Sequence, residues 1–239
     1  RLANYPQVQN LSDYPYLNRI AGDAEYRLYT LAYNFGVDVS ENFQLYSSGT
    51  WGHKFAQAYE NYRVPNLVTG LNGVRPRPLG FSPQLGTDEN DYAITVGGTG
   101  DAGGWTVDLS STYGRDEHEI FLHNSFNRDL YIDTSTATTN GFSPSDFRAG
   151  NFIGSQWTTN LDLRHEFDVG LASPLTLALG AEYRKDTYEI VSGDDASRYK
   201  SGSQSYPGFS LTDAGDHARD SKAVYANVAV EPITSLQVA

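Results

Sequence analysis

The chain has 239 residues, of which 39% are hydrophobic and 13% aromatic, and its net charge is −12. The charge disfavours binding to nucleic acid, and the absence of any run of about 18 or more apolar residues excludes a helical membrane protein. The absence of Cys excludes disulfides and thiolate chemistry. Because the chain also lacks Met and a signal-peptide pattern over residues 1–10, we expect its natural start to lie upstream.

The elements predicted along the chain are β-strands, since apolar and polar residues alternate with a period of two in segments of about ten residues. The abundance of Gly, Tyr and Phe (23, 17 and 11 residues) fits strands with one apolar face and one face that contacts water. Three hairpins and a seventh strand are expected over residues 29–37 and 43–55, 92–96 and 105–113, 157–167 and 175–183, and about 223–231. An eighth strand would begin over residues 236–239.

Register can be predicted in the first and third hairpins, because apolar positions must meet across an antiparallel pair. Pairing Val37 with Phe43 continues one apolar surface along the first hairpin. Pairing Phe167 with Leu175 does the same in the third. Each hairpin is therefore expected to present a continuous apolar surface.

Aromatic residues are expected to form girdles at both ends of this surface. One girdle lies far from the turns and contains Tyr29, Trp51, Tyr113, Trp157 and Tyr183. The other lies close to the turns and contains Phe43, Trp105 and Phe167. The roughly eight steps from Trp105 to Tyr113, tilted by about 45°, span about 19 Å, comparable with the roughly 25 Å apolar band of outer-membrane barrels. A soluble sandwich also alternates, but it seldom places charges such as Asp162 and Arg164 opposite a Trp-rimmed face.

Three long connections, over about 56–88, 115–154 and 190–221, alternate strictly with the short turns. Short periplasmic turns and long extracellular loops are the usual arrangement in outer-membrane barrels. The sequence thus predicts an all-β fold, an antiparallel transmembrane β-barrel of which about seven to eight strands are present. The residues expected to line the lumen of this barrel are Asp108, Asp162, Arg164, Glu182 and Arg184.

Several segments resemble the barrel region of TonB-dependent receptors. They read QWTTNLDL (156–163), FDVGLASPL (167–175) and GAEYR (180–184), with loop signatures GFSP (80–83) and GSQSYPGF (202–209). The resemblance covers essentially the whole chain and implies a barrel of about 22 strands, closed by an amino-terminal plug. Residues 1–239 would be part of that one barrel domain. A plug is not recognisable, so contact with the energising TonB protein is expected through the missing plug region.

The resemblance implies active uptake of a scarce ligand, such as a siderophore, cobalamin or an oligosaccharide, in the bacterial outer membrane. Outer-membrane lipid and lipopolysaccharide are the other expected partners; enzyme activity, cofactors and nucleic acid are not expected. A passive porin or adhesin barrel, and a secreted carbohydrate-binding β-domain, are the alternatives. A closed eight-stranded barrel is a further structural alternative. The narrow interior of such a barrel would be filled with side chains. The polar face of these strands instead carries small residues, such as Gly36, Ser48, Gly52 and Thr112, which suit a wider lumen.

Three motifs suggest a cofactor or metal site, but each is better explained as an ordinary structural feature. Residues 98–103 match G-x-G-x-x-G, but a dinucleotide site must open a helix, and here Trp105 opens a strand. His118-Glu119 with His123 suggests zinc, but the histidines are five apart in a predicted loop rather than four apart on a helix. The pair Asp194-Asp195 could bind a divalent cation, although adjacent carboxylates in a Ser-Gly-rich loop are usually just solvated. No metal site is therefore predicted.

The long loops carry the candidate ligand-binding residues. Aromatic rings can stack on a ligand and arginines can pair with its anionic groups, although loop packing is the alternative for each. The candidates are Tyr59, Tyr62, Arg63, Arg75, Arg77 and Phe81 in the first loop, His123, Phe126, Arg128 and Tyr131 in the second, and Tyr199 and Tyr206 in the third.

Overall fold

The computed structural model describes residues 4–18, 22–233 and 236–238. Its strands are β1 (Glu25–Ser40), β2 (Phe43–Tyr59), β3 (Gln84–Ala102), β4 (Trp105–His123), β5 (Phe147–Phe167), β6 (Leu175–Ser192), β7 (Gly215–Ile233) and β8 (Leu236–Val238). Its helices are η2 (Pro6–Asn10), η3 (Pro65–Leu67) and α1 (Arg128–Thr134). None of the helices in these ranges is long and apolar enough to span a membrane.

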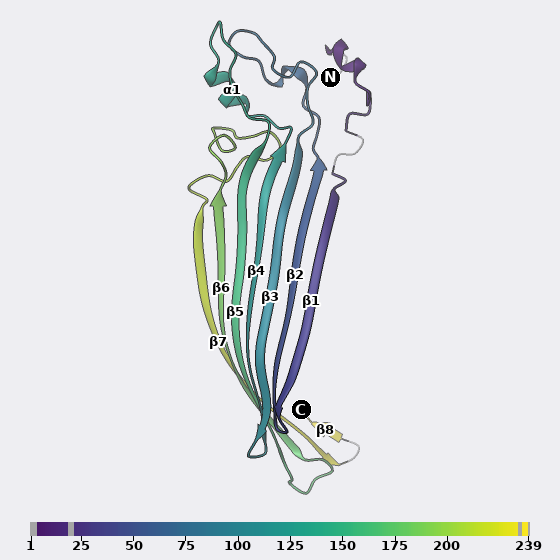
Figure 1. The fold of residues 1–239 in the computed structure, drawn as a ribbon, viewed down its shortest axis with the longest axis vertical. Coiled ribbons are helices and arrows are strands. Elements are labelled where there is room, and N and C mark those ends of the chain that lie inside the picture. The colour runs from purple at the N-terminus through teal and green to yellow at the C-terminus, as the bar shows by residue number, and fades with distance from the viewer. Residues whose placement is uncertain (1–3, 19–21, 234–235, 239) are drawn as a thin grey trace.

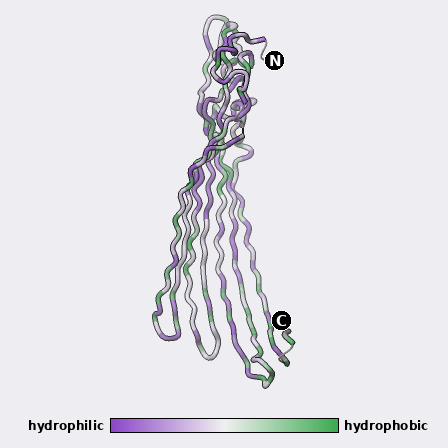
Figure 2. Tube along the Cα trace, turned by 90° about the vertical axis from the view of Figure 1, so that its right-hand side faces the viewer, coloured by the Kyte–Doolittle hydropathy of each residue, from purple (hydrophilic) through white to green (hydrophobic). Residues whose placement is uncertain are grey.

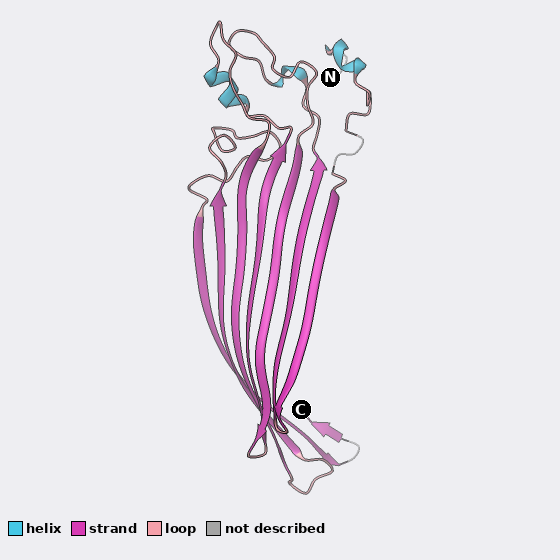
Figure 3. Ribbon diagram, in the orientation of Figure 1, coloured by secondary structure: helices cyan, strands magenta, loops and turns pink. Residues whose placement is uncertain are grey.

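The strands form one antiparallel sheet in chain order, so every strand pairs with its neighbours in the sequence. Seven strands are long, and β8 pairs with β7 at only two positions. The sheet is twisted, and all the described helices lie at one end of it (Figure 3). Over the described residues the sheet is open, with β1 and β8 at its two edges. The all-β antiparallel prediction is confirmed, and the closed eight-stranded alternative does not describe this structure.

Short turns and long loops occupy opposite ends of the sheet (Figure 1). The turn between β3 and β4 is the dipeptide Gly103-Gly104, with φ of 60° and 84°. Two-residue hairpin turns with positive φ match the twist of the flanking strands, which is why Gly is favoured there. Residues 60–83, 124–146 and 193–214 form the long loops at the other end. The predicted alternation of short and long connections is confirmed.

The predicted register is confirmed in the third hairpin and wrong in the first. Phe167 pairs with Leu175 as expected. Val37 pairs with Leu45 instead of Phe43, because β1 continues to Ser40 and only two residues form the turn, with an irregularity in the pairing next to it. The shift is two residues, so each side chain keeps its predicted face of the sheet.

The strands are longer than predicted at the loop end. β4 reaches His123 and β5 begins at Phe147, so the loop between them is much shorter than residues 115–154. The sequence hides these extensions because both faces of β4 are polar over residues 115–119. On one face, for example, Arg115 and Glu117 form an ion pair, with Arg115 Nη2 3.0 Å from Glu117 Oε2. The backbone hydrogen bonds between β3 and β4 continue through these polar residues. β7 is also longer than predicted. The eighth strand is predicted over residues 236–239, and its last residue, Ala239, lies outside the described residues.

One face of the sheet, called the apolar face below, presents large hydrophobic side chains to its surroundings. The register aligns Leu45, Leu109 and Leu161 in one row across β2 to β5, and Tyr113 beside Trp157 in a higher row. Leu109 is 54% exposed and Trp157 51% exposed. Hydrophilic residues predominate where the strands meet the long loops, so the apolar belt ends below them (Figure 2). The folded chain thus leaves a wide apolar surface uncovered.

The opposite face, called the polar face below, carries hydroxyls, amides and charges in the same rows. Thr112, Thr158 and Arg184 align across β4 to β6. These side chains are less accessible than those of the apolar face, and Thr158 is only 8% exposed.

Candidate functional site

The three long loops pack into one body above the sheet. Val68 and Phe81 of the first loop form an apolar cluster with Phe126 and Tyr131 of the second. The rings of Phe126 and Tyr131 lie 5.4 Å apart in a tilted arrangement. Burying these four side chains compensates for the entropy lost when long loops are ordered.

Asn127 joins the second loop to the third and is fully buried. Its side-chain oxygen accepts the backbone N–H of Leu130 and so caps the start of α1. Its amide nitrogen donates to the carbonyls of Ala196 and Tyr199, at 2.8 and 2.9 Å. One side chain therefore satisfies polar groups of two loops, and its own polar atoms are paired inside the protein.

Two carboxylates of α1 stabilise the contact between the second and third loops. Asp129 accepts hydrogen bonds from the hydroxyl and the backbone N–H of Ser201, which hold the pKa of Asp129 below its usual value. Lys200 and then the hydroxyl of Tyr199 lower the pKa of Asp133 in the same way. Both aspartates are therefore ionised at neutral pH, when their contacts with the third loop are complete.

Three of the predicted ligand-binding residues lie inside the loop body. Phe81, Phe126 and Tyr131 are 4–5% exposed. Arg77 covers two of these rings, with its guanidinium carbon 5.6 Å from the Phe81 centroid and 5.7 Å from that of Phe126. Arg77 also donates to the side chain of Asn124. These four residues thus pack the loops together.

Tyr62 and Arg63 are held close to their own loop. The Tyr62 hydroxyl donates to the carbonyl of Leu79, and burial raises the pKa of this tyrosine. Arg63 pairs with Phe81 in an isolated bridge and donates to the Asn61 carbonyl. They stabilise the fold of the first loop.

The remaining candidates differ in exposure. His123 ends β4 and its Nδ1 lies 3.0 Å from a carboxylate oxygen of Asp146. Tyr206 lines a cavity beneath the third loop, whereas Tyr199 bonds to Asp133. Tyr59 is the last residue of β2 and not part of the first loop. It is exposed, and so are Arg75, His123 and Arg128.

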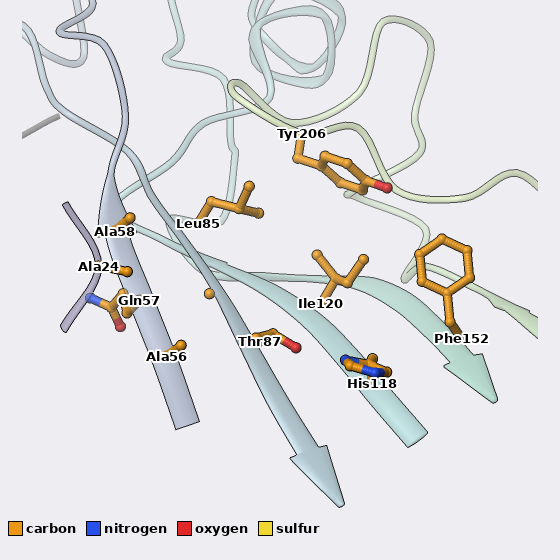
Figure 4. Close-up of a pocket in the computed structure, with 11 residues that line it drawn as sticks. Ala24, Ala56, Gln57, Ala58, Leu85, Thr87, His118, Ile120, Phe152 and Tyr206 are labelled. Carbon is orange, nitrogen blue, oxygen red and sulfur yellow. The ribbon is translucent and has the colours of Figure 1, made fainter. Parts of the chain in front are cut away.

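An apolar cavity of about 470 Å³ lies between the upper polar face and the third loop (Figure 4). Its walls combine small and branched residues of the strands with two aromatic rings. The labelled lining residues are Ala24, Ala56, Gln57, Ala58, Leu85, Thr87, His118, Ile120, Phe152 and Tyr206. Of the residues predicted to bind a ligand, only Tyr206 lines this cavity, because the sequence predicts loops where the apolar residues of this face lie in strands.

The five residues predicted to line a lumen all lie on the polar face, as the strand register requires. Asp108 accepts a hydrogen bond from the hydroxyl of Tyr46 at 2.8 Å. Asp162 accepts one from the hydroxyl of Tyr225 at 2.7 Å. Arg164 and Arg184 pair with the glutamates two residues away along their own strands, Glu166 and Glu182. The polar face thus carries paired charges and hydroxyls.

The glycine-rich motif and the Asp194-Asp195 pair both have structural roles. Residues 98–102 continue β3, and Gly103 with Gly104 forms the hairpin turn that follows. Asp194 accepts the backbone N–H groups of Arg148 and Ser197, and Asp195 pairs with Arg198. These carboxylates therefore shape the third loop.

The predicted loop position of His118 and Glu119 is wrong, because both lie in β4. Neighbouring residues of a strand point to opposite faces, and so do residues five apart. His118 therefore lies on the polar face, away from Glu119 and His123. Its Nε2 lies 2.7 Å from Asp116 Oδ2, and its Nδ1 lies 3.5 Å from Glu89 Oε2. The sequence signal for this group is the Asp116-x-His118 spacing in a strand.

Comparison of the sequence with known protein families and with curated proteins finds no match. The resemblance to TonB-dependent receptors consequently stays a prediction.

Proposed function

We propose that the chain is part of a transmembrane β-barrel of the bacterial outer membrane, and that this barrel belongs to a TonB-dependent receptor. The observation that carries the proposal is the uncovered apolar face, bordered by Trp51, Tyr113 and Trp157 on the loop side and by Trp105 and Phe167 on the turn side. In water such a surface would drive aggregation. Against lipid it is the expected exterior of a barrel, with aromatic residues at both interfaces.

The polar face supports the second part of the proposal. Paired charges and hydroxyls are compatible with an aqueous lumen, whereas a narrow barrel interior would need larger packed side chains. The loops above it, which pack against one another, would form the extracellular entrance, where Arg75 and Arg128 are exposed to a ligand. Together with the resembling segments, this supports energised uptake of a siderophore, cobalamin or an oligosaccharide through the complete barrel.

The energy source distinguishes this function from a passive porin. Cells that carry the complete protein are given a labelled ferric siderophore, cobalamin or a maltooligosaccharide, with and without a protonophore. We expect uptake of one of these ligands to fall to the level of cells without the protein when the proton-motive force is collapsed, because TonB can then relay no energy. Protein-dependent uptake that persists with the protonophore would instead establish a passive porin.

A further inference from the structure

We propose that Glu89, Asp116 and His118 form a binding site for a divalent cation of the zinc type on the polar face. Each residue offers one ligand atom, and the three atoms lie within 4.8 Å of one another. One imidazole and two carboxylates are donors that zinc accepts, whereas calcium and magnesium prefer oxygen alone. This proposal does not rest on the uptake function.

The strand ladder fixes the three residues relative to one another. Glu89 of β3 stands directly opposite His118 of β4, and Asp116 precedes His118 by two residues, so all three project from the same face. β3 and β4 are interior strands: β3 is hydrogen-bonded to β2 and β4, and β4 is hydrogen-bonded to β3 and β5. The ligands thus stand on rigid elements, which is what a preorganised metal site requires.

The distances suit a small ion. Zinc bonds of about 2.0–2.2 Å in a tetrahedral arrangement place neighbouring ligand atoms roughly 3.4 Å apart. His118 Nδ1 lies 3.5 Å from Glu89 Oε2, and Asp116 Oδ2 lies 2.7 Å from His118 Nε2. The two carboxylates lie beside different nitrogens of the His118 ring, and one ion can take only one of these nitrogens. Rotation of the Asp116 or His118 side chain would therefore be needed to bring the three donors around one ion, and the hydrogen bond between His118 and Asp116 would be exchanged for metal bonds.

A second observation points to a missing partner at this place. The Oδ1 atom of Asp116 is buried and has no hydrogen-bond partner among the described residues. A buried carboxylate oxygen without a partner is unfavourable, and a cation that is bound by both carboxylate oxygens of Asp116 removes that cost. His118 also lines the apolar cavity, so a fourth position on the ion could be taken by water or by a ligand atom there.

Lys54 is the natural competitor for the cation. Its Nζ lies 3.0 Å from Glu89 Oε2, so in the metal-free protein it neutralises that carboxylate. An incoming ion must share or displace the ammonium group. Replacing Lys54 by the uncharged Met removes the competing charge and is therefore expected to tighten binding.

The test is isothermal titration of the purified protein in detergent micelles with zinc chloride, and in parallel with calcium and magnesium chloride. We expect one zinc ion per chain, with weaker binding of the other two. His118→Ala and Glu89→Gln should weaken zinc binding at least about tenfold, since each removes a ligand. His53→Ala is the matched control, because His53 lies 3.5 Å from Asp88 on the other face and belongs to no cluster of three His or carboxylate ligands among the described residues.

Lys54→Met gives a result in the opposite direction, so a loss of folding in the other variants cannot imitate it. Tighter zinc binding by Lys54→Met, together with unchanged binding by His53→Ala, supports the site. The proposal is overturned if the unsubstituted protein shows no saturable zinc binding. It is also overturned if folded His118→Ala binds zinc as tightly as His53→Ala.

Discussion

Leu161→Arg is expected to destabilise the protein in a lipid bilayer by about 2–4 kcal/mol, the cost of placing a charged side chain at the midplane of the lipid-facing surface. Leu161 lies in the middle row of the apolar face, between Leu109 and Ala181. The measurement is a urea titration of the protein folded in phosphatidylcholine vesicles, followed by fluorescence of its three tryptophans.

Asn160→Arg is the matched control, because Asn160 precedes Leu161 and points to the polar face. Its partner across the strands is Glu182, which can pair with the new arginine. We expect a change of less than about 1 kcal/mol, as for most substitutions on a solvated surface. Equal destabilisation by the two arginines would mean that the two faces do not differ in environment, contrary to the proposal.

Asn127→Ala should produce the second large effect, which is confined to the loops. The substitution removes the cap of α1, worth about 1 kcal/mol, and takes the amide donor from two partly buried carbonyls of the third loop, at about 1–3 kcal/mol. Hydrogen exchange should therefore become faster in residues 124–146 and 193–214 while the strands stay protected. Asn140→Ala is the control, since Asn140 is exposed and bonds only to the Asn72 side chain among the described residues.

If Asn127→Ala leaves exchange in both loops as slow as Asn140→Ala does, then Asn127 does not hold the loops together. Faster exchange throughout the sheet would also contradict the account. It would show that the loop body and the strands unfold as one unit.

The faces of the strands could be predicted from the sequence because the period-two pattern survives errors of register. In the first hairpin Val37 pairs with Leu45 rather than Phe43, yet no side chain changes face. A shift by an even number of residues preserves the alternation, so hydropathy cannot distinguish such registers. The turn geometry next to Ser40 decides between them, and it leaves no apolar signal.

The ends of the strands and the loop body could not be predicted in this way. β4 continues through Arg115 and Glu117 because its backbone is paired on both sides, although neither face is apolar there. The role of Asn127 depends on contacts with residues about 70 positions away. His118 was compared with a helical spacing of histidines, whereas a strand makes the spacing of two from Asp116 the relevant one.

The most direct test of the membrane proposal uses the absence of cysteine from the chain. A single cysteine is introduced at each position from 157 to 165 in β5, spin-labelled, and studied in vesicles. We predict that collision with oxygen, which concentrates in lipid, peaks at the odd positions of the apolar face. Collision with a water-soluble nickel complex should peak at the even positions. Nickel collisions that are equally frequent at all positions, or highest at the odd ones, would contradict a lipid-facing sheet.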